Sequence, residues 1–311
     1  MGSRIIGLGH ELPAALERAG VIRPIAVEAV GVSTLAARAS AGALAQAQLA
    51  ADAVDFIVFA TMTPDVTFPG AACYLQDQLG CRTVGALDVR AQCAGFIYGL
   101  TVADRFIRAG VYHHVLVAGG EVHSAGLDYS EKGVHIARLF GDGAGVVVLG
   151  PADGERGVRS AVLHADGQHH RSFWCEYPAS RQHPTRMTLA DFLSGRHFPA
   201  IDLDAMRRFG AETLPAVITE AVHAAAVSMD RVDHFIIGHV LPDVVDSAAR
   251  QLGIASARLT NPSARYGHLT AAALPVALSE DVASGALAAG ATVCLAAAGA
   301  GFAWGAAVVT L

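Results

Sequence analysis

The sequence predicts an α/β fold made of two related halves. The first observation behind this prediction is an alternation of apolar, β-branched runs with alanine-rich stretches of helical character. It is seen in residues 55–61, 69–79, 84–89, 94–109 and 114–120, which read as strand, helix, strand, helix and strand. Such an alternation is typical of a parallel sheet covered by helices on both faces. The second half of the chain repeats the pattern.

The second observation is that the two halves align directly. Residues 54–65, VDFIVFATMTPD, match residues 232–243, VDHFIIGHVLPD, at Val, Asp, Pro and Asp without a gap. Each half also ends with a glycine-rich turn before an apolar strand, at 140–150 and 297–309. Matches in the same order indicate an internal duplication. A polar, turn-rich stretch near residue 153 predicts the boundary, with an N-terminal half over 1–153 and a C-terminal half over 154–311.

The composition predicts an oligomer and argues against a nucleic-acid binder. Charged residues make up 16% of the 311 residues, against roughly 25% in average soluble proteins. The low charge indicates a surface partly covered by a second subunit, most simply a second copy of this chain. The net charge is −6 and no long run of either sign occurs, so the basic patch of a nucleic-acid binder is not expected.

The cysteine count and the ends of the chain predict a cytoplasmic protein. Five cysteines without CxxC spacing, in a chain large enough to need no disulfide, indicate free thiols in a reducing compartment. The first ten residues lack the apolar core of a signal peptide. Residues 290–311 are uncharged and long enough to cross a bilayer. The Gly-Ala-Gly in their middle favours a turn between two buried strands instead of a membrane span.

Cys93 is the first candidate for chemistry. It lies between a strand predicted to be buried, 84–89, and an amphipathic helix predicted over 94–109. At a helix N-terminus the free N–H groups and the macrodipole favour an anion, which predicts a thiol pKa below its usual value of about 8.5. A packed, inert cysteine is the competing interpretation, and the local sequence leaves both open. The other cysteines lack this setting and are expected in the core: Cys73, Cys81, Cys175 and Cys294.

Two histidines are candidates to act with Cys93. His239 directly follows a predicted strand, and His268 precedes a predicted helix. In a duplicated α/β fold the strand ends of both halves can converge on one crevice, so the three side chains can meet. An ordinary buried or polar histidine remains the alternative for each. A further group matches no standard zinc spacing, so no metal is predicted there: His164, His169, His170 and Cys175.

Five segments, taken together, resemble the β-ketoacyl-[acyl carrier protein] synthase III family of the thiolase superfamily. They are TMTPDVTFPGAACYLQDQLG, DVRAQCAGFIYGL, LFGDGAGVVVL, VLHADG and GAGFAWGAAVV, and they occur in the family's order over nearly the whole chain. The resemblance implies a thiolase-like fold, in which two duplicated α/β halves form a five-layered αβαβα core.

The resemblance also implies the roles of three side chains. Cys93 would be the nucleophile that accepts the acyl group, and His239 the first catalytic histidine. His268 stands where the family has the asparagine of GN(T/S)SAAS. It is similar to the second histidine of the elongating ketosynthases, in their GHTxGAAG motif. The resemblance implies that both imidazoles donate N–H groups to the enolate that forms on decarboxylation.

Three further positions are assigned by the resemblance. The backbone amides of Cys93 and Gly301 would form the oxyanion hole. Phe302 would line the substrate pocket, and Phe68 the acyl pocket of the opposite protomer.

The implied reaction is acyl loading on Cys93 followed by decarboxylative Claisen condensation with a malonyl thioester. The substrates would be acyl-CoA or acyl carrier protein thioesters, with no other cofactor, and the enzyme a homodimer. Two departures favour a carrier-protein donor and a role in polyketide or other secondary metabolism. The family's W-x-x-x-R-(S/T)-G-I segment, whose tryptophan and arginine clamp coenzyme A, has no counterpart in residues 20–33, GVIRPIAVEAVGVS, and the HQAN motif is HVLP at 239–242.

Four alternatives remain at the level of sequence. An acyltransferase of the same fold would pass the acyl group from Cys93 to a hydroxyl or amine, with His239 as general base. A thiolase would need a second cysteine where Ala298 stands. A non-catalytic subunit would have lost Cys93. A papain-type protease would show a different sequence around its cysteine.

Overall fold

Two five-stranded sheets form the framework of the protein. The computed structural model describes residues 2–152 and 156–311. The first sheet has the strand order β1-β7-β6-β4-β5. Its strands are β1 (Gly2–Glu11), β4 (Phe56–Ala60), β5 (Gly85–Val89), β6 (Val115–Glu121) and β7 (Gly143–Ala152). The second sheet has the order β12-β11-β13-β14-β8. Its strands are β8 (Gly157–Ala165), β11 (His234–Gly238), β12 (Leu259–Thr260), β13 (Thr292–Gly299) and β14 (Ala303–Thr310).

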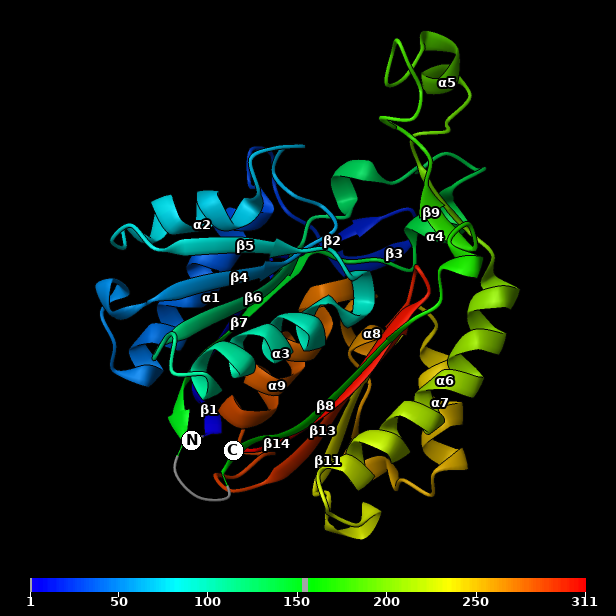
Figure 1. Cartoon of the computed structure of the whole chain (residues 1–311). Helices are drawn as coiled ribbons and strands as arrows, with labels where there is room; N and C mark the ends of the chain where they lie inside the picture. The colour runs from blue at the N-terminus through cyan, green and yellow to red at the C-terminus, as the bar shows by residue number, and fades with distance from the viewer. Residues whose placement is uncertain (1, 153–155) are drawn as a thin grey trace.

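Helices form three layers around and between these sheets (Figure 1). The outer face of the first sheet carries α1 (Val32–Ala47) and α2 (Ala71–Leu79). Between the sheets lie α3 (Gly95–Arg108) and α9 (Ala273–Ala283), which contact strands of both. The outer layer of the second sheet is α6 (Leu203–Ala224) with α7 (Pro242–Gln251). These five layers are the αβαβα core of a thiolase-like fold, as predicted.

The strand order shows the internal duplication. Strands β1, β7, β6, β4 and β5 correspond in position and direction to β8, β14, β13, β11 and β12. The two segments aligned by sequence, 54–65 and 232–243, contain the equivalent strands β4 and β11. The predicted boundary between residues 153 and 154 lies outside the described residues and stays a prediction.

The sheets are largely parallel, as predicted, but each contains one reversed strand. In the first sheet β7 runs antiparallel to the other four strands, and in the second sheet β14 does. A tight turn joins β13 directly to β14. Because no crossover helix lies between them to carry the chain back, β14 must run antiparallel to β13. Residues 290–311 are therefore a hairpin of two strands, as the Gly-Ala-Gly turn predicted. In the described part of the chain no helix is both long and apolar enough to span a membrane.

β5 is an edge strand, which corrects the prediction that residues 84–89 are buried. It pairs only with β4, and Leu87 is 40% exposed. Asp88 of this strand accepts hydrogen bonds from the amides of Ala71 and Ala72, both 2.8 Å, at the start of α2. That contact brings the preceding loop, with its 79% exposed Phe68, close to the strand. An open strand edge beside exposed apolar side chains is a surface that proteins normally cover.

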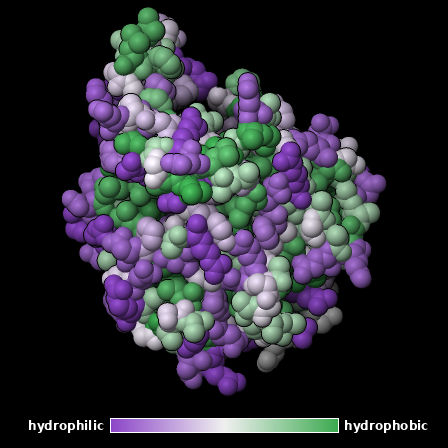
Figure 2. Space-filling view, turned by 180° about the vertical axis from the view of Figure 1, so that it is seen from behind, coloured by the Kyte–Doolittle hydropathy of each residue, from purple (hydrophilic) through white to green (hydrophobic). Residues whose placement is uncertain are grey.

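An arm over residues 170–201 projects from the body (Figure 1). It contains β9 (Phe173–Cys175), α5 (Leu189–Leu193) and β10 (Pro199–Ile201). Arg196 pairs with Glu176 and with Asp191 inside the arm. Figure 2 shows an apolar tip on the arm, where Leu189, Phe192 and Leu193 are exposed.

The remaining elements of the described residues are short. They are the hairpin β2 (Ala15–Arg18) and β3 (Val21–Pro24), the helices α4 (Val134–Ala137) and α8 (Pro262–Tyr266), and seven 3₁₀ turns: η1 (Ala51–Ala53), η2 (Gln92–Ala94), η3 (Ser124–Gly126), η4 (Gly167–His169), η5 (Met229–Arg231), η6 (Ser256–Arg258) and η7 (Thr270–Ala272).

All five cysteines are free thiols, as predicted, but they are not all in the core. Cys81, Cys93 and Cys294 are buried, whereas Cys73 and Cys175 are exposed. The prediction of a core position is therefore wrong for these two, which lie on a surface face of α2 and on the projecting arm.

Candidate active site

Cys93 lies in η2, the short turn that joins β5 to α3 near the middle of the molecule. The preceding residue, Gln92, has a φ of 45°, a left-handed conformation that is unfavourable for a residue with a side chain. A Cβ on Gly299 would lie only 2.1 Å from the Cys93 sulfur. The glycine-rich turn after β13 therefore leaves the space that the sulfur occupies.

Burial controls the ionisation of this thiol. Cys93 is 1% exposed, and desolvation raises the pKa of its thiol to about 12. Hydrogen bonds from the backbone amides of Ala300 and Cys93 lower this pKa, while the charge of Glu121 raises it. The predicted lowering of the Cys93 pKa is thus wrong for the substrate-free protein, because loss of hydration outweighs the helix N-terminus.

The two amides on the sulfur belong to Cys93 and Ala300. Ala300 is one residue before Gly301, for which the oxyanion-hole role was predicted. An amide directed at the sulfur differs from one directed at a substrate oxyanion, so the oxyanion-hole roles of the Cys93 and Gly301 amides stay predictions.

His268 is in direct contact with Cys93. Its Nε2 lies 3.0 Å from the Cys93 Sγ, although the residues are 175 positions apart. Backbone contacts with the first half hold the histidine in place: the His268 amide donates to the Leu139 carbonyl at 2.6 Å, and the Gly141 amide donates to the His268 carbonyl at 3.3 Å. The structure thus brings the nucleophile candidate of one half onto a histidine of the other.

The motif FGDGAG, residues 140–145, makes this approach possible. A Cβ on Gly141 would lie 2.4 Å from the Tyr266 carbonyl oxygen, and one on Gly145 would lie 2.5 Å from the Val276 nitrogen. Any side chain at these positions would push the segment carrying His268 away from the first half.

His239 is fully buried against α6. Its Nδ1 lies 3.1 Å from the Leu241 amide nitrogen and 3.3 Å from the Leu241 carbonyl oxygen. The amide can only donate and makes the shorter contact, so Nδ1 is the acceptor and the proton of the neutral ring is on Nε2. That Nε2 has no hydrogen-bond partner among the described residues. The Met206 carbonyl is close enough to raise the pKa, but burial dominates and lowers the pKa of His239 to about 4. His239 is therefore a neutral ring with one free N–H donor.

His239 does not hydrogen-bond to Cys93. Ser263 connects it to the site, because the Ser263 hydroxyl donates to the His239 carbonyl oxygen at 2.7 Å.

His123 is a third buried histidine that the sequence analysis missed. Its Nε2 lies 2.7 Å from the Thr270 hydroxyl, in the turn after His268. Burial lowers the pKa of His123 to about 3. Burial is also the main cause that lowers the pKa of His268 well below its usual value, with further lowering by His123 and His239. His123 lies two residues beyond the end of β6, whereas His239 directly follows β11, so a search of the first few residues after each strand would have found it.

Glu121 is the second residue that was missed. Its carboxyl group accepts hydrogen bonds from the Thr63 hydroxyl at 2.6 Å and from the amides of Thr63 and Met62 at 3.1 and 3.2 Å. Burial nevertheless raises the pKa of Glu121 to about 8. This carboxyl fastens the loop that leads to Phe68 onto β6, beneath the site. A lone acidic residue at the end of a strand carries no signal in the sequence that would have selected it.

Comparison with known proteins agrees with this geometry. Residues 87–167 match the family model of 3-oxoacyl-[acyl-carrier-protein] synthase III, and residues 222–311 match the model of its C-terminal part. A β-ketoacyl-[acyl-carrier-protein] synthase III of Rhodospirillum centenum is 37% identical, over 94% of this chain and 88% of the relative. The chain belongs to the ketosynthase III family. One from Oceanobacillus iheyensis is 32% identical over 98% of both chains.

Solved structures of the ketosynthase III family have the same fold. The 3-oxoacyl-[acyl-carrier-protein] synthase III of Aquifex aeolicus superposes with a TM-score of 0.89 at 27% identity, covering all of both chains. The priming β-ketosynthase of the R1128 polyketide pathway has a TM-score of 0.87 at 25% identity, over 99% of this chain and 96% of that one. The protein is a ketosynthase III-like, acyl-transferring enzyme.

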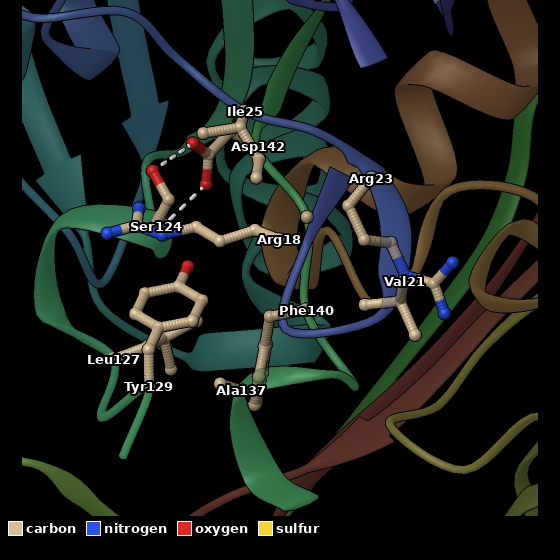
Figure 3. Close-up of a pocket in the computed structure, with 11 residues that line it drawn as sticks. Arg18, Val21, Arg23, Ile25, Ser124, Leu127, Tyr129, Ala137, Phe140 and Asp142 are labelled. Carbon is tan, nitrogen blue, oxygen red and sulfur yellow. Dashed lines mark hydrogen bonds between the residues drawn. The ribbon is translucent and has the colours of Figure 1, made fainter. Parts of the chain in front are cut away.

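A narrow pocket of this ketosynthase III-like enzyme lies close to His268 (Figure 3). The β2–β3 hairpin forms one wall, and the guanidinium of Arg18 lies 3.7 Å from the centre of the Tyr129 ring. Opposite, Asp142 accepts hydrogen bonds from the Ser124 hydroxyl at 2.5 Å and the Ser124 amide at 2.9 Å. Phe140 separates the pocket from the site, with its ring centre 5.9 Å from that of His268.

The two phenylalanines predicted to line pockets have different settings. Phe302 is buried. Its ring stacks on the rings of Phe209 in α6 and of His169, with 3.7 and 5.4 Å between the ring centres. Phe68 is 79% exposed and does not line the pocket of Figure 3. Both pocket roles stay predictions.

No metal-binding group occurs within residues 2–152 and 156–311. The residues considered as a metal cluster in the sequence, His164, His169, His170 and Cys175, form no such group and make other contacts. His164 bonds to Glu220 at 2.7 Å, and His169 stacks on Phe302.

The buried histidines make stability depend on pH. The folded pKa of His123, about 3, is below the value of about 6.5 expected in the unfolded chain, so the unfolded state takes up a proton first as pH falls. The stability that His123 contributes should therefore be complete above about pH 6.5 and be lost as the pH falls below that value. In urea unfolding between pH 7.5 and 5, His123→Gln should reduce the steepness of this loss by up to about 1.4 kcal/mol per pH unit. Equal slopes for both proteins would contradict the assignment.

Gly210 of α6 leaves the space that the His239 ring occupies. A Cβ there would lie 2.7 Å from the His239 Nε2. Gly210→Ala should displace the ring and lower the condensation rate at least about tenfold, while acyl loading of Cys93 changes little. Product formation and the mass of the loaded protein measure the two steps separately. Gly167→Ala is the control, because nothing lies within 4 Å of a Cβ at that position. Unchanged condensation in Gly210→Ala would remove His239 from the mechanism.

Proposed function

We propose that the enzyme loads an acyl group from a thioester onto Cys93 and then condenses it, with loss of carbon dioxide, with a malonyl thioester. The observation that carries this proposal is the 3.0 Å contact between the Cys93 sulfur and the His268 Nε2. The contact is buried, and backbone amides of Cys93 and Ala300 lie on the same sulfur.

Acyl loading needs a proton acceptor beside the thiol. Because burial raises the Cys93 pKa to about 12, the thiol is protonated at rest. The proton passes to His268 Nε2 as the sulfur attacks the carbonyl carbon of the acyl thioester. The resulting oxyanion would be held by the backbone amides of Cys93 and Gly301, as the resemblance implies. When the C–S bond to the donor breaks, the leaving thiolate takes the proton back from His268. One thioester replaces another, so this step needs little driving force.

Condensation needs stabilisation of an enolate. As the malonyl thioester loses carbon dioxide, negative charge develops on its thioester oxygen. The free Nε2–H of His239 is a suitable donor to that oxygen, and one preorganised donor is worth about 3 kcal/mol. Because His239 is neutral, it stabilises the charge without protonating the enolate carbon. That carbon then attacks the acyl group on Cys93, the C–S bond to Cys93 breaks, and the expelled thiolate takes up a proton from water, with His268 Nε2 as the relay.

The same contacts argue against the alternative acyltransferase, in which His239 deprotonates a hydroxyl or amine. A general base needs an unprotonated nitrogen facing the acceptor. The unprotonated Nδ1 of His239 is already occupied by the Leu241 amide. Condensation uses the nitrogen that is free, so we favour it.

We infer that the acyl donor or acceptor is bound to an acyl carrier protein. Relatives of this chain carry that partner in their names. The two tryptophans of the chain, Trp174 and Trp304, lie in the projecting arm and in β14, so neither can replace the missing coenzyme A clamp of residues 20–33. A product for fatty acid-like or polyketide metabolism fits this chemistry, and free thiols fit a cytoplasmic site of action.

We further propose a homodimer that shares residues between its sites. The open edge of β5, the exposed Leu87 and the 79% exposed Phe68 form one surface. Pairing of two β5 edges would cover it and would carry each Phe68 towards the acyl pocket of the partner. A phenylalanine so exposed in the single chain is otherwise without a packing role.

Acyl loading is tested by intact mass after incubation with acyl-CoA and acyl carrier donors. Cys93→Ala should show no added mass, whereas His268→Asn should load more slowly and retain part of the activity. Addition of malonyl carrier protein to the loaded enzyme should release a β-ketoacyl product. Loading of Cys93→Ala at the wild-type level would assign the nucleophile elsewhere, and an ester or amide formed from added alcohol or amine would favour acyl transfer.

The sharing of Phe68 is tested with mixed dimers. Phe68→Ala alone should change the preferred acyl chain length. Mixing this variant with Cys93→Ala gives dimers in which the working Cys93 faces the intact Phe68 of its partner, and these should recover the wild-type preference. If the mixed dimers instead keep the altered chain-length preference of Phe68→Ala, Phe68 acts in the site of its own subunit.

A further inference from the structure

Ser263 connects the two histidines of the site. It lies in α8, five residues before His268, and is 3% exposed. Its hydroxyl is 2.7 Å from the His239 carbonyl oxygen and 3.2 Å from the His268 Nδ1. The His268 ring is thus held between two atoms, with Ser263 Oγ on Nδ1 and Cys93 Sγ on Nε2 at 3.0 Å.

The protons in this chain can be assigned one by one. A serine hydroxyl has a single proton, and a carbonyl oxygen can only accept. The short contact to the His239 carbonyl therefore uses the Ser263 proton. Towards His268, the hydroxyl oxygen can only accept, so His268 Nδ1 carries a hydrogen. A neutral imidazole has one N–H, so Nε2 has the lone pair and accepts the S–H of Cys93.

We propose that Ser263 is a positioning residue, which holds His268 in the tautomer that takes the proton of Cys93. The inference rests on the proposed role of Cys93 as acyl acceptor. The S–H bond breaks, an N–H bond forms at Nε2, and Ser263 keeps the opposite hydrogen in place. His268 then becomes an imidazolium for the time that the acyl group is transferred, and the leaving thiolate removes the added proton.

This assignment separates the roles of the two histidines. The sequence predicted that both donate N–H groups to the enolate. The Nδ1–H of His268 is bonded to Ser263, and its Nε2 carries a lone pair that faces the Cys93 sulfur. In this tautomer His268 has no N–H to donate on the side of the substrate. His239 has the opposite tautomer, set by the Leu241 amide, and is the donor. The other titratable groups around the pair are His123, which lowers the pKa of His268, and Glu121, which raises that of Cys93.

The tautomer can be observed directly in the wild-type protein. Long-range ¹H–¹⁵N couplings of ¹⁵N-histidine-labelled protein distinguish Nδ1–H from Nε2–H rings, and His268→Asn identifies the signal that belongs to His268. We expect His268 in the Nδ1–H form and His239 in the Nε2–H form. In Ser263→Ala, the His268 signal should move towards the Nε2–H form. A wild-type His268 that is already in the Nε2–H form would overturn the proposal.

The chemical consequence is measured by alkylation of Cys93 with iodoacetamide. Peptide-resolved mass spectrometry is needed, because Cys73 and Cys175 are exposed and also react. At pH 7, Ser263→Ala should slow alkylation of Cys93 about tenfold, the lower range for a lost acid–base contribution. A folded Ser263→Thr, which keeps the hydroxyl, should stay within about twofold of wild type. In the His268→Asn background, Ser263→Ala should have no further effect, since the base is already absent.

Two results would refute the role of Ser263. One is an equal loss from Ser263→Ala with and without His268, which would mean a general effect on packing. The other is a folded Ser263→Thr as slow as Ser263→Ala, which would mean that the hydroxyl does not act. Failure of the proposed function looks different, because the wild-type protein would then form no acyl adduct on Cys93 while the tautomer and the alkylation rates remained as expected.

Discussion

The active site depends on one close contact between the two halves of the chain. Each half places a strained turn before its inner helix: Gln92, before α3, has a φ of 45°, and Thr270, before α9, has a φ of 50°. These turns occupy corresponding positions in the duplicated topology, and they contact each other. One presents Cys93 and the other follows His268. The contact is possible only because Gly141, Gly145 and Gly299 leave room where a Cβ would collide.

Burial at this contact keeps the whole site neutral at rest. Removal of water raises the pKa values of Cys93 and Glu121 and lowers those of His123, His239 and His268. A neutral site can be packed without isolated buried charges, which are costly. Charge then appears only during the reaction, beside groups already in position for it. Under these conditions a thiol with a pKa of about 12 needs a base in direct contact, and His268, 3.0 Å from the sulfur, would be that base.

The residues around the pair divide into those that react and those that hold them. Cys93, His239 and His268 would exchange protons or hydrogen bonds with substrate. Ser263 and the Leu241 amide set the two histidine tautomers in opposite senses, which gives two similar rings different tasks. This division accounts for a histidine at position 268, because an asparagine amide has no basic nitrogen to accept a thiol proton.

The sequence alone determined the order of elements, the internal duplication, the positions of Cys93, His239 and His268, and the membership of the family. These features are local: apolar periodicity, turn residues and motif spacing are properties of short segments. The tertiary structure alone decided the direction of the Cys93 pKa, the edge position of β5, the amide of Ala300 on the sulfur, and the parts played by His123, Glu121 and Ser263. Each of these depends on what surrounds a group in space. Hydration is lost, and hydrogen-bond partners are acquired, only when segments as distant as residues 93 and 268 come together.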